Sequence, residues 1–184
     1  GDMKEAIRNL EIYLESDETH YLTQWKLLQL KVQQGTPKVS LQASKRFLKL
    51  LPDFGPARLI RARALQQMQH YDQAAADFKA ALKDPLLNET DRFDARQALY
   101  FITQQKGDDT EAFQHLSTLI RDYPKSITLN QEYAQALEQR GQLEQAASVW
   151  GNISRLSRDE AVISKSQRAH AAVLQKLGKH DEAM

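Results

Sequence analysis

The sequence contains no cysteine, which excludes disulfide bonds and thiolate metal sites. The absence is compatible with a reducing or an oxidising compartment, so it leaves the localisation open between cytoplasm and periplasm. No run of apolar residues approaches the roughly 18 that a membrane-spanning helix needs, and we expect no membrane insertion of this segment. The N-terminal stretch is amphipathic and charged, unlike a signal peptide.

An excess of one charge sign is missing as well. The 25 basic and 24 acidic residues give a formal net charge of +1. Proteins that bind nucleic acid usually carry a basic excess on one face, so nucleic acid is not an expected partner. With 41% hydrophobic and 27% charged residues, the 184-residue chain has the composition of an ordinary globular domain or of an extended array.

Patterns that carry catalysis or bind metals are not found either. The five histidines are scattered, with no HExxH or paired spacing. Asp108 and Asp109 are adjacent carboxylates, but they follow Gly107 at an expected helix start, where acids complement the helix dipole. Three arginines crowd one expected helix, with acids nearby for local pairing: Arg58, Arg61 and Arg63 with Asp72, Asp77 and Asp84. We therefore expect no enzyme activity, no cofactor and no metal.

The strongest positive signal is a helical hairpin within residues 133–153. Tyr133, Ala134 and Leu137 lie on one face of a first helix, which Gly141 ends. A second helix follows with apolar residues at helical spacing, namely Leu143, Ala146, Trp150 and Ile153. The small residues predict where the two backbones approach each other, and the large ones fill the remaining space.

Glycines recur along the chain at the interhelix position of this hairpin. They are Gly1, Gly35, Gly107, Gly141 and Gly178, and two of the intervals between them are 34 residues. The 72-residue interval from Gly35 to Gly107 is two such units plus four residues, with Gln69 at the skipped position. After these interhelix positions the sequence predicts second helices at residues 4–14, 71–82, 110–120 and 143–153.

In these features the chain resembles the tetratricopeptide repeat family along essentially its whole length. Small residues at motif position 20 are Ala6, Ala74, Ala112, Ala146 and Ala183. Large residues at position 24 are Leu10, Phe78, Leu116 and Trp150, and position 27 holds Tyr13, Ala81, Leu119 and Ile153. Prolines close three repeats, namely Pro52, Pro85 and Pro124.

The resemblance implies an all-α, right-handed superhelical solenoid of antiparallel helix pairs over residues 1–184. The repeats expected from it are 21–54, 55–88, 93–126 and 127–160, with a half-repeat at 1–20 and a partial repeat at 164–184. Residues 89–92 and 161–163 are insertions between repeats. Asn88 or Thr90 is the expected N-cap of the helix that follows the insertion at 89–92. Because both ends fall inside a repeat, we expect the chain to be a fragment of a longer array.

The local register of residues 21–54 stays open. Counted from Gly35 and Pro52, position 4 is Gln24 and position 24 is Ser44, which are poor core residues. A first helix shifted by one residue would instead present Trp25, Leu28 and Val32, and a longer turn would present Ala43, Phe47 and Leu50.

In the resembling family, the first helices line a concave groove that binds partners. Carried over position by position, the candidate groove residues are Gln29, Gln33, Arg63, Gln67, Gln97, Phe101, Gln105, Gln131, Gln135, Gln139, Arg168 and Lys176. Glutamine amides donate and accept hydrogen bonds without charge, which suits a peptide backbone or sugar hydroxyls. Alternatively, the glutamines are helix formers that keep an exposed face soluble.

Three further features leave alternatives open. Trp25 is either a stacking platform in the groove or a core residue, whereas Phe101 is expected to face the groove. Lys165, Arg168 and Lys176 either meet an acidic partner or form a solvated helix face. The family's carboxylate clamp for chaperone tails is not reproduced, so that partner is not expected.

The function expected from this resemblance is a protein-interaction scaffold that binds a peptide or a partner domain. A second hypothesis is a periplasmic repeat segment of an exopolysaccharide export protein, whose groove guides polysaccharide. A third is a structural spacer that self-associates through uncapped ends.

Overall fold

The structure is a computed structural model that describes residues 2–178 of the 184-residue chain. Within these residues it contains ten α-helices and no β-strand. The chain divides into two compact units, Gly1–Ile102 and Thr103–Met184. The all-α prediction is therefore confirmed, whereas the repeat boundaries and their continuity in one solenoid stay predictions.

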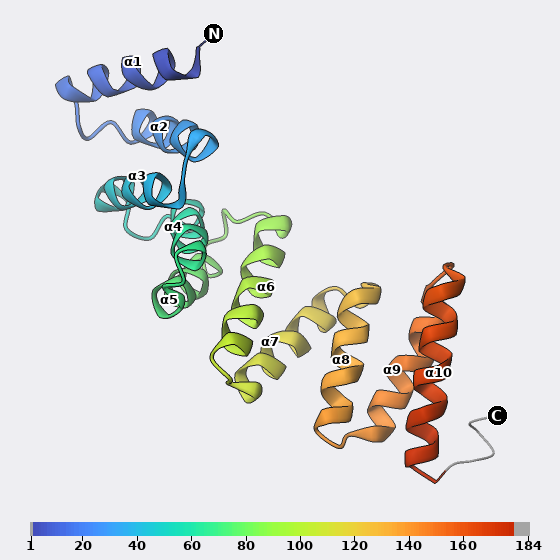
Figure 1. Ribbon diagram of the computed structural model, residues 1–184. Coiled ribbons are helices and arrows are strands. Elements are labelled where there is room, and N and C mark those ends of the chain that lie inside the picture. Colours follow the sequence, from blue (N-terminus) through green and yellow to red (C-terminus); the bar gives the residue numbers. More distant parts are fainter. Residues whose placement is uncertain (1, 179–184) are drawn as a thin grey trace. The chain divides into compact units, whose positions relative to one another are not determined.

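The first unit is a succession of helices in which each of the first five packs against its neighbour in the chain (Figure 1). Its helices are α1 (Met3–Ser16), α2 (Tyr21–Gln34), α3 (Pro37–Leu50), α4 (Gly55–Gln67), α5 (Tyr71–Ala81) and α6 (Glu89–Gln105), whose end from Thr103 onward belongs to the second unit. One hydrophobic cluster joins α4, α5 and α6 through Leu59, Phe78 and Leu99.

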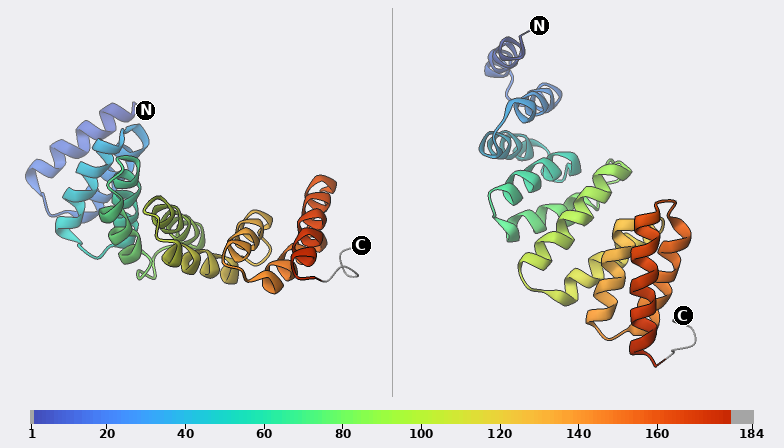
Figure 2. Two further views of the ribbon diagram at one scale, coloured as in Figure 1. Left: turned by 60° about the horizontal axis from the view of Figure 1, so that its bottom comes forward. Right: turned by 45° about the vertical axis from the view of Figure 1, so that its right-hand side comes forward.

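The second unit follows the same plan with four helices. They are α7 (Asp109–Asp122), α8 (Ile127–Gln139), α9 (Leu143–Leu156) and α10 (Glu160–Lys176). Helix α9 packs against both α8 and α10, and the three lie in succession in every view (Figures 1 and 2). Their shared core contains Leu137, Trp150, Ile153 and Val173.

The expected hairpin cores are confirmed in the three pairs with the clearest pattern. In α5, the side chains of Ala74, Phe78 and Ala81 are fully buried. The corresponding residues of α7 and α9 are also buried, namely Ala112, Leu116, Leu119, Ala146, Trp150 and Ile153. Alanine at the first of the three positions lets the paired backbones approach, and the larger residue one turn later fills the widening gap.

Helix α1 departs from this pattern. Ala6 is exposed, Leu10 is half-buried and Tyr13 remains 47% exposed, so the core positions expected for them are wrong. The buried residue of α1 is Leu14, on the side that packs against α2. A helix in a repeat array buries only the faces that neighbours cover, and within the described residues α2 is the main neighbour of α1. Ala183, expected at the same motif position, lies outside the described residues.

In residues 21–54 the structure keeps the register counted from Gly35 and Pro52. Gln24 and Ser44 are 5% and 0% exposed, although both are polar. The amide of Gln24 donates to the carbonyl of Glu18 at 2.7 Å, and the Ser44 hydroxyl donates to the carbonyl of Ser40 at 2.7 Å. Local hydrogen bonds therefore satisfy these groups, which is the condition for burying them.

Both expected insertions lengthen a first helix. Helices α6 and α10 have 17 residues each, whereas α4 and α8 have 13. The side chain of Asn88 accepts a hydrogen bond from the Asp91 backbone at 2.8 Å, so Asn88 rather than Thr90 caps α6. Asp159 caps α10 in the same way by accepting from Ala161 at 2.8 Å.

Three interhelix turns have the same backbone geometry, but one lacks glycine. Gly107, Gly141 and Gln69 have φ angles of 70°, 72° and 61°. In each turn the next residue's N–H donates to a carbonyl five residues back, as His70 does to Leu65 at 2.9 Å. This is the hydrogen bonding of a Schellman cap, in which glycine is favoured because a side chain is strained at positive φ.

Gln69→Gly is expected to stabilise the first unit by about 0.5 to 1 kcal/mol, because relief of strain outweighs the added freedom of the unfolded chain. Thermal unfolding followed by circular dichroism would show a midpoint higher by roughly 1 to 4 °C. The control is Gln67→Gly at the exposed end of α4, which should destabilise by about 0.5 to 1 kcal/mol. A lower unfolding midpoint for Gln69→Gly than for the wild type would contradict the proposed backbone strain at Gln69.

Candidate functional site

A groove of about 400 Å³ opens between α8 and α10 in the second unit, with α9 below it. Its lining combines polar residues of α8 with a small-residue face of α10 and one aromatic residue of α9. These residues are Gln135, Glu138, Gln139, Trp150, Lys165, Ala169 and Ala172. Most of them fall on first helices at the motif positions expected to face a groove.

The floor of the groove is fixed by Trp150. Its side chain is only 2% exposed and belongs to the core of the second unit. The indole N–H donates to Oε1 of Glu138 at 2.8 Å, and Nζ of Lys176 lies 3.1 Å from Oε2 of the same carboxylate. Both oxygens of Glu138 are therefore occupied, which holds this wall of the groove in one geometry.

The rim of the groove is polar and mostly uncharged. Gln135 and Gln139 are exposed on α8, and Lys165 is exposed on α10 across from them. Two amides supply hydrogen-bond donors and acceptors, the lysine supplies one positive charge, and the alanines leave room for a chain to approach. This arrangement is suited to binding an extended polar chain.

The predicted groove residues divide into two groups in the structure. Gln135 and Gln139 line the groove, and Lys176 fixes its wall through Glu138. The others lie elsewhere: Gln29, Gln33, Gln67, Gln97, Phe101, Gln105 and Arg168 are exposed outside it, and Gln131 is half-buried. Arg168 donates to the carbonyl of Ser164 at 3.4 Å.

Arg63 is occupied by ion pairs within the first unit. Its guanidinium lies 3.0 Å from the carboxylate of Asp91 and 2.8 Å from that of Asp94, so it ties α4 to α6. Both acids lie in the first two turns of α6, which include the inserted residues 89–92. The ion pairs of Arg63 therefore depend on the N-terminal extension of α6. An arginine held in this way is less available to a partner than its position in the sequence predicts.

The two aromatic candidates have different surroundings. Phe101 is 42% exposed, as expected, and makes an edge-on contact with Tyr71 at 6.4 Å between ring centroids. Trp25 is half-buried and packs against Phe47 at 5.4 Å and Phe54 at 5.0 Å. Trp25 therefore packs at the edge of the core of the first unit, as the core interpretation predicts, although the helix is not shifted.

Local pairing accounts for the other arginines of α4. Arg61 binds both carboxylate oxygens of Asp77 at 2.6 Å, and Arg58 lies 3.6 Å from the same group. The hydrogen bond to Asp77 raises the pKa of Arg61, although burial acts in the opposite direction. Asp84 was expected in this cluster, but it accepts instead from the backbone N–H groups of Gly55 and Leu86.

The predicted site omitted several residues of the groove. Glu138 and Lys165 lie at groove-facing motif positions, so the pattern contained the signal for them. For Ala169 and for the indole of Trp150 the sequence carried no such signal, because their place in the lining of the groove depends on how α8 and α10 pack on α9.

Neither a metal site nor a membrane span is found among residues 2–178. No group of three or more histidine or acidic side chains is arranged to hold an ion in this part of the chain. None of the described helices combines the length and the hydrophobicity that crossing a bilayer requires.

The helix arrangement is shared with several solved structures. No protein-family model matches the sequence, and no curated protein matches it significantly. The crystal structure of MamA is 22% identical, with a TM-score of 0.67 over 88% of this chain and 86% of that one. YrrB, which is described as a TPR protein with an unusual peptide-binding site, is 13% identical, with a TM-score of 0.69 over 95% of this chain and 87% of that one. This chain has the tetratricopeptide-repeat fold.

A third structure with this fold is PilF of Pseudomonas aeruginosa. It is 15% identical, with a TM-score of 0.64 over 98% of this chain and 79% of that one. At such identities the likeness concerns the tetratricopeptide-repeat fold alone.

Proposed function

We propose that this protein is a non-enzymatic scaffold that binds a peptide, or an extended segment of a partner protein, in the groove between α8 and α10. The observation that carries the proposal is the groove itself, where the predicted Gln135 and Gln139 meet Lys165 above a fixed aromatic floor. The description of YrrB as a tetratricopeptide-repeat protein with a peptide-binding site supports this class of function.

The chemistry of the groove favours an extended peptide. A peptide backbone presents one donor and one acceptor per residue, and the amides of Gln135 and Gln139 can bond to both. These residues are four apart on α8, so their side chains stand one helical turn from each other, roughly 5 to 6 Å. Lys165 on the opposite wall adds a preference for a carboxylate, either a side chain or a free C-terminus.

The exposed glutamines of the first unit lie outside this groove and are separate candidate contacts for a partner. Gln29, Gln33, Gln67 and Gln97 lie on α2, α4 and α6 of the first unit. Each contributes little alone, so we expect single substitutions there to change binding less than substitutions in the groove.

The test starts from a phage library of random ten-residue peptides selected on the immobilised protein. Selected peptides are then titrated by calorimetry against the wild type and the double variant Gln135→Ala/Gln139→Ala. Loss of two net hydrogen bonds of about 0.5 to 1.5 kcal/mol each should weaken binding roughly 5- to 150-fold. The matched control is Gln145→Ala, since Gln145 is exposed on α9 outside the groove.

Two outcomes would overturn the proposal. One is enrichment of peptides whose affinity is unchanged in the double variant, which would remove the groove as their site. The other is failure of any peptide to enrich while oligosaccharides bind and the double variant abolishes that binding, which would favour the polysaccharide hypothesis.

A further inference from the structure

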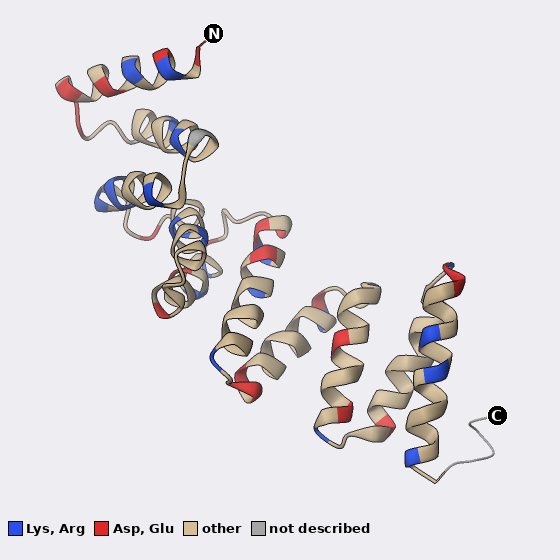
Figure 3. Cartoon of the chain, in the orientation of Figure 1, with Lys and Arg blue, Asp and Glu red and all other residues tan. Residues whose placement is uncertain are grey.

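Basic residues are concentrated in one segment of the first unit despite the balanced net charge. Residues 19–52 contain six lysines and arginines and no aspartate or glutamate. Figure 3 shows this contrast, with blue and no red on α2 and α3 and several red positions on α1. A net charge near zero therefore does not mean that basic and acidic residues are evenly distributed along this chain.

On α3 the positive charges form one stripe along the helix. Lys38, Gln42, Lys45 and Lys49 follow each other at intervals of four, three and four residues, which places them on one face. The buried residues Ser44, Phe47 and Leu48 form a different face, so the stripe points away from the core. At 1.5 Å per residue, the stripe is about 16 Å long.

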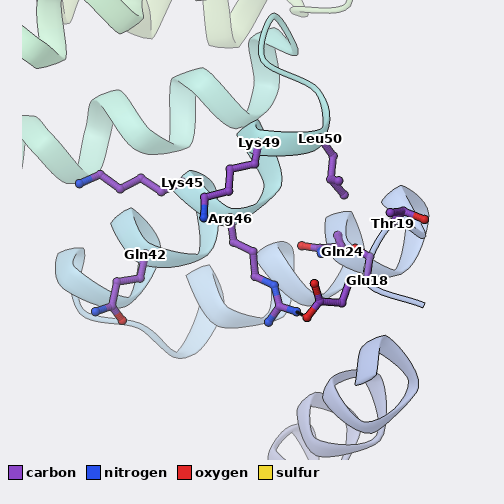
Figure 4. A pocket seen from close by; sticks show the side chains of 8 residues that line it. All are labelled: Glu18, Thr19, Gln24, Gln42, Lys45, Arg46, Lys49 and Leu50. Carbon is purple, nitrogen blue, oxygen red and sulfur yellow. Dashed lines mark hydrogen bonds and ion pairs between the residues drawn. The ribbon is translucent and has the colours of Figure 1, made fainter. Parts of the chain in front are cut away.

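The stripe borders a recess of about 640 Å³ between α3 and the turn before α2 (Figure 4). Its lining residues are Glu18, Thr19, Gln24, Gln42, Lys45, Arg46, Lys49 and Leu50. In Figure 4 the side chains of Arg46 and Glu18 point toward each other. Their charged groups are 4.0 Å apart and the Glu18 side chain is 79% exposed, so this contact is long and solvated.

The lysines of the recess differ from the arginines of the neighbouring helix. On α4, Arg58, Arg61 and Arg63 all bind carboxylates at 3.0 Å or less. Within the described part of the chain, Lys45 and Lys49 form no ion pair. The positive charge of α4 is thus used to hold the fold together, whereas Lys45 and Lys49 on α3 remain available.

We infer that the recess beside α3 is a docking site for an acidic segment of a partner protein. Carboxylates of that segment neutralise Lys45 and Lys49, and one of them competes with Glu18 for Arg46. Lys45 and Lys49 are one helical turn apart, and alternate side chains of an extended peptide are separated by a similar distance of roughly 7 Å. The site lies in the first unit and is independent of the groove in the second.

The features of the recess favour an acidic peptide over other polyanions. No aromatic residue lines it, so nucleotide bases would find no stacking surface. Glu18 in its wall repels a continuous line of phosphates, but a peptide can place an uncharged residue there. The concave shape suits single side chains better than the flat surface of an anionic membrane.

The test uses a fluorescein-labelled peptide with four glutamates alternating with serines, and the same peptide with glutamine in place of glutamate. Fluorescence anisotropy with the whole chain should show binding of the glutamate peptide only, weakening at least about tenfold from 50 to 500 mM salt. Lys45→Gln/Lys49→Gln should reduce the affinity at least tenfold. Lys26→Gln/Lys83→Gln changes the charge equally outside the recess and should reduce it less than threefold.

A second pair of variants tests the role of Glu18. Glu18→Gln removes the competing carboxylate and should raise the affinity about two- to fivefold, whereas Glu15→Gln outside the recess should not. Equal losses of affinity in Lys45→Gln/Lys49→Gln and in Lys26→Gln/Lys83→Gln would overturn the proposed site. So would tighter binding of a single-stranded oligonucleotide or of phosphatidylserine vesicles than of the glutamate peptide.

Discussion

Trp150→Ala is expected to lower the free energy of unfolding of the second unit by about 3 to 5 kcal/mol. The side chain is 2% exposed and lies in a cluster with Leu137, Ile153 and Val173, so its removal leaves a cavity among three helices. It also leaves Oε1 of Glu138 without the indole hydrogen bond of 2.8 Å. Both losses act on the hairpin that gave the clearest signal in the sequence.

Urea unfolding followed by circular dichroism measures this effect, and the protein offers an internal reference. The chain has two tryptophans, Trp25 in the first unit and Trp150 in the second. In the Trp150→Ala variant the remaining tryptophan fluorescence comes from Trp25 and should report an unfolding transition of the first unit close to that of the wild type. A simultaneous shift of both transitions would show that the units unfold together.

Trp150→Phe is the matched control. It keeps most of the buried ring but loses the N–H donor, so a smaller loss of about 1 to 3 kcal/mol is expected. A Trp150→Ala protein as stable as the wild type would contradict the packing of α9 between α8 and α10.

Asp77→Asn is expected to destabilise the first unit by about 2 to 4 kcal/mol. The Asp77 side chain is 6% exposed and receives two hydrogen bonds of 2.6 Å from Arg61, which is itself 26% exposed. Breaking a buried ion pair commonly costs about 3 to 5 kcal/mol, and the partial exposure of Arg61 reduces this cost because the guanidinium can regain water. Chemical unfolding followed by circular dichroism is the measurement.

The control is Asp53→Asn. Asp53 also pairs with an arginine, Arg58, at 2.9 Å, but its side chain is 98% exposed. An exposed pair contributes little, so this variant should unfold within about 0.5 kcal/mol of the wild type. Equal effects of the two substitutions would show that burial of Asp77 does not decide the strength of its pair.

The pH dependence of the Asp77→Asn effect follows from the direction of the Arg61 pKa. The hydrogen bond to Asp77 raises this pKa, so the guanidinium stays charged throughout the neutral and mildly alkaline range. A group with a raised folded-state pKa loses its stabilising contribution only when the pH rises through that value. The destabilisation should therefore be the same at pH 7 and pH 9.

The sequence by itself determined where the helices lie and which of their faces are buried in the clearest pairs. Alanine, a large residue four positions later and an apolar residue seven positions later recur in α5, α7 and α9, and all nine side chains are buried. A helix period is a local property, because residues three and four apart share a face whatever that face meets. The turn glycines Gly107 and Gly141 were predictable for the same reason, since their positive φ is a local requirement.

Only the tertiary structure decided which polar residues are occupied and which remain available. Gln24 and Ser44 are buried because neighbouring helices cover them and nearby carbonyls accept their hydrogen bonds. Lys176 and Glu138 are 38 residues apart, and their contact depends on how α8 and α10 are placed by α9. Helical periodicity fixes the direction of a side chain but not what stands opposite, so the groove, and the lack of an ion pair at Lys45 and Lys49 within residues 2–178, follow from packing.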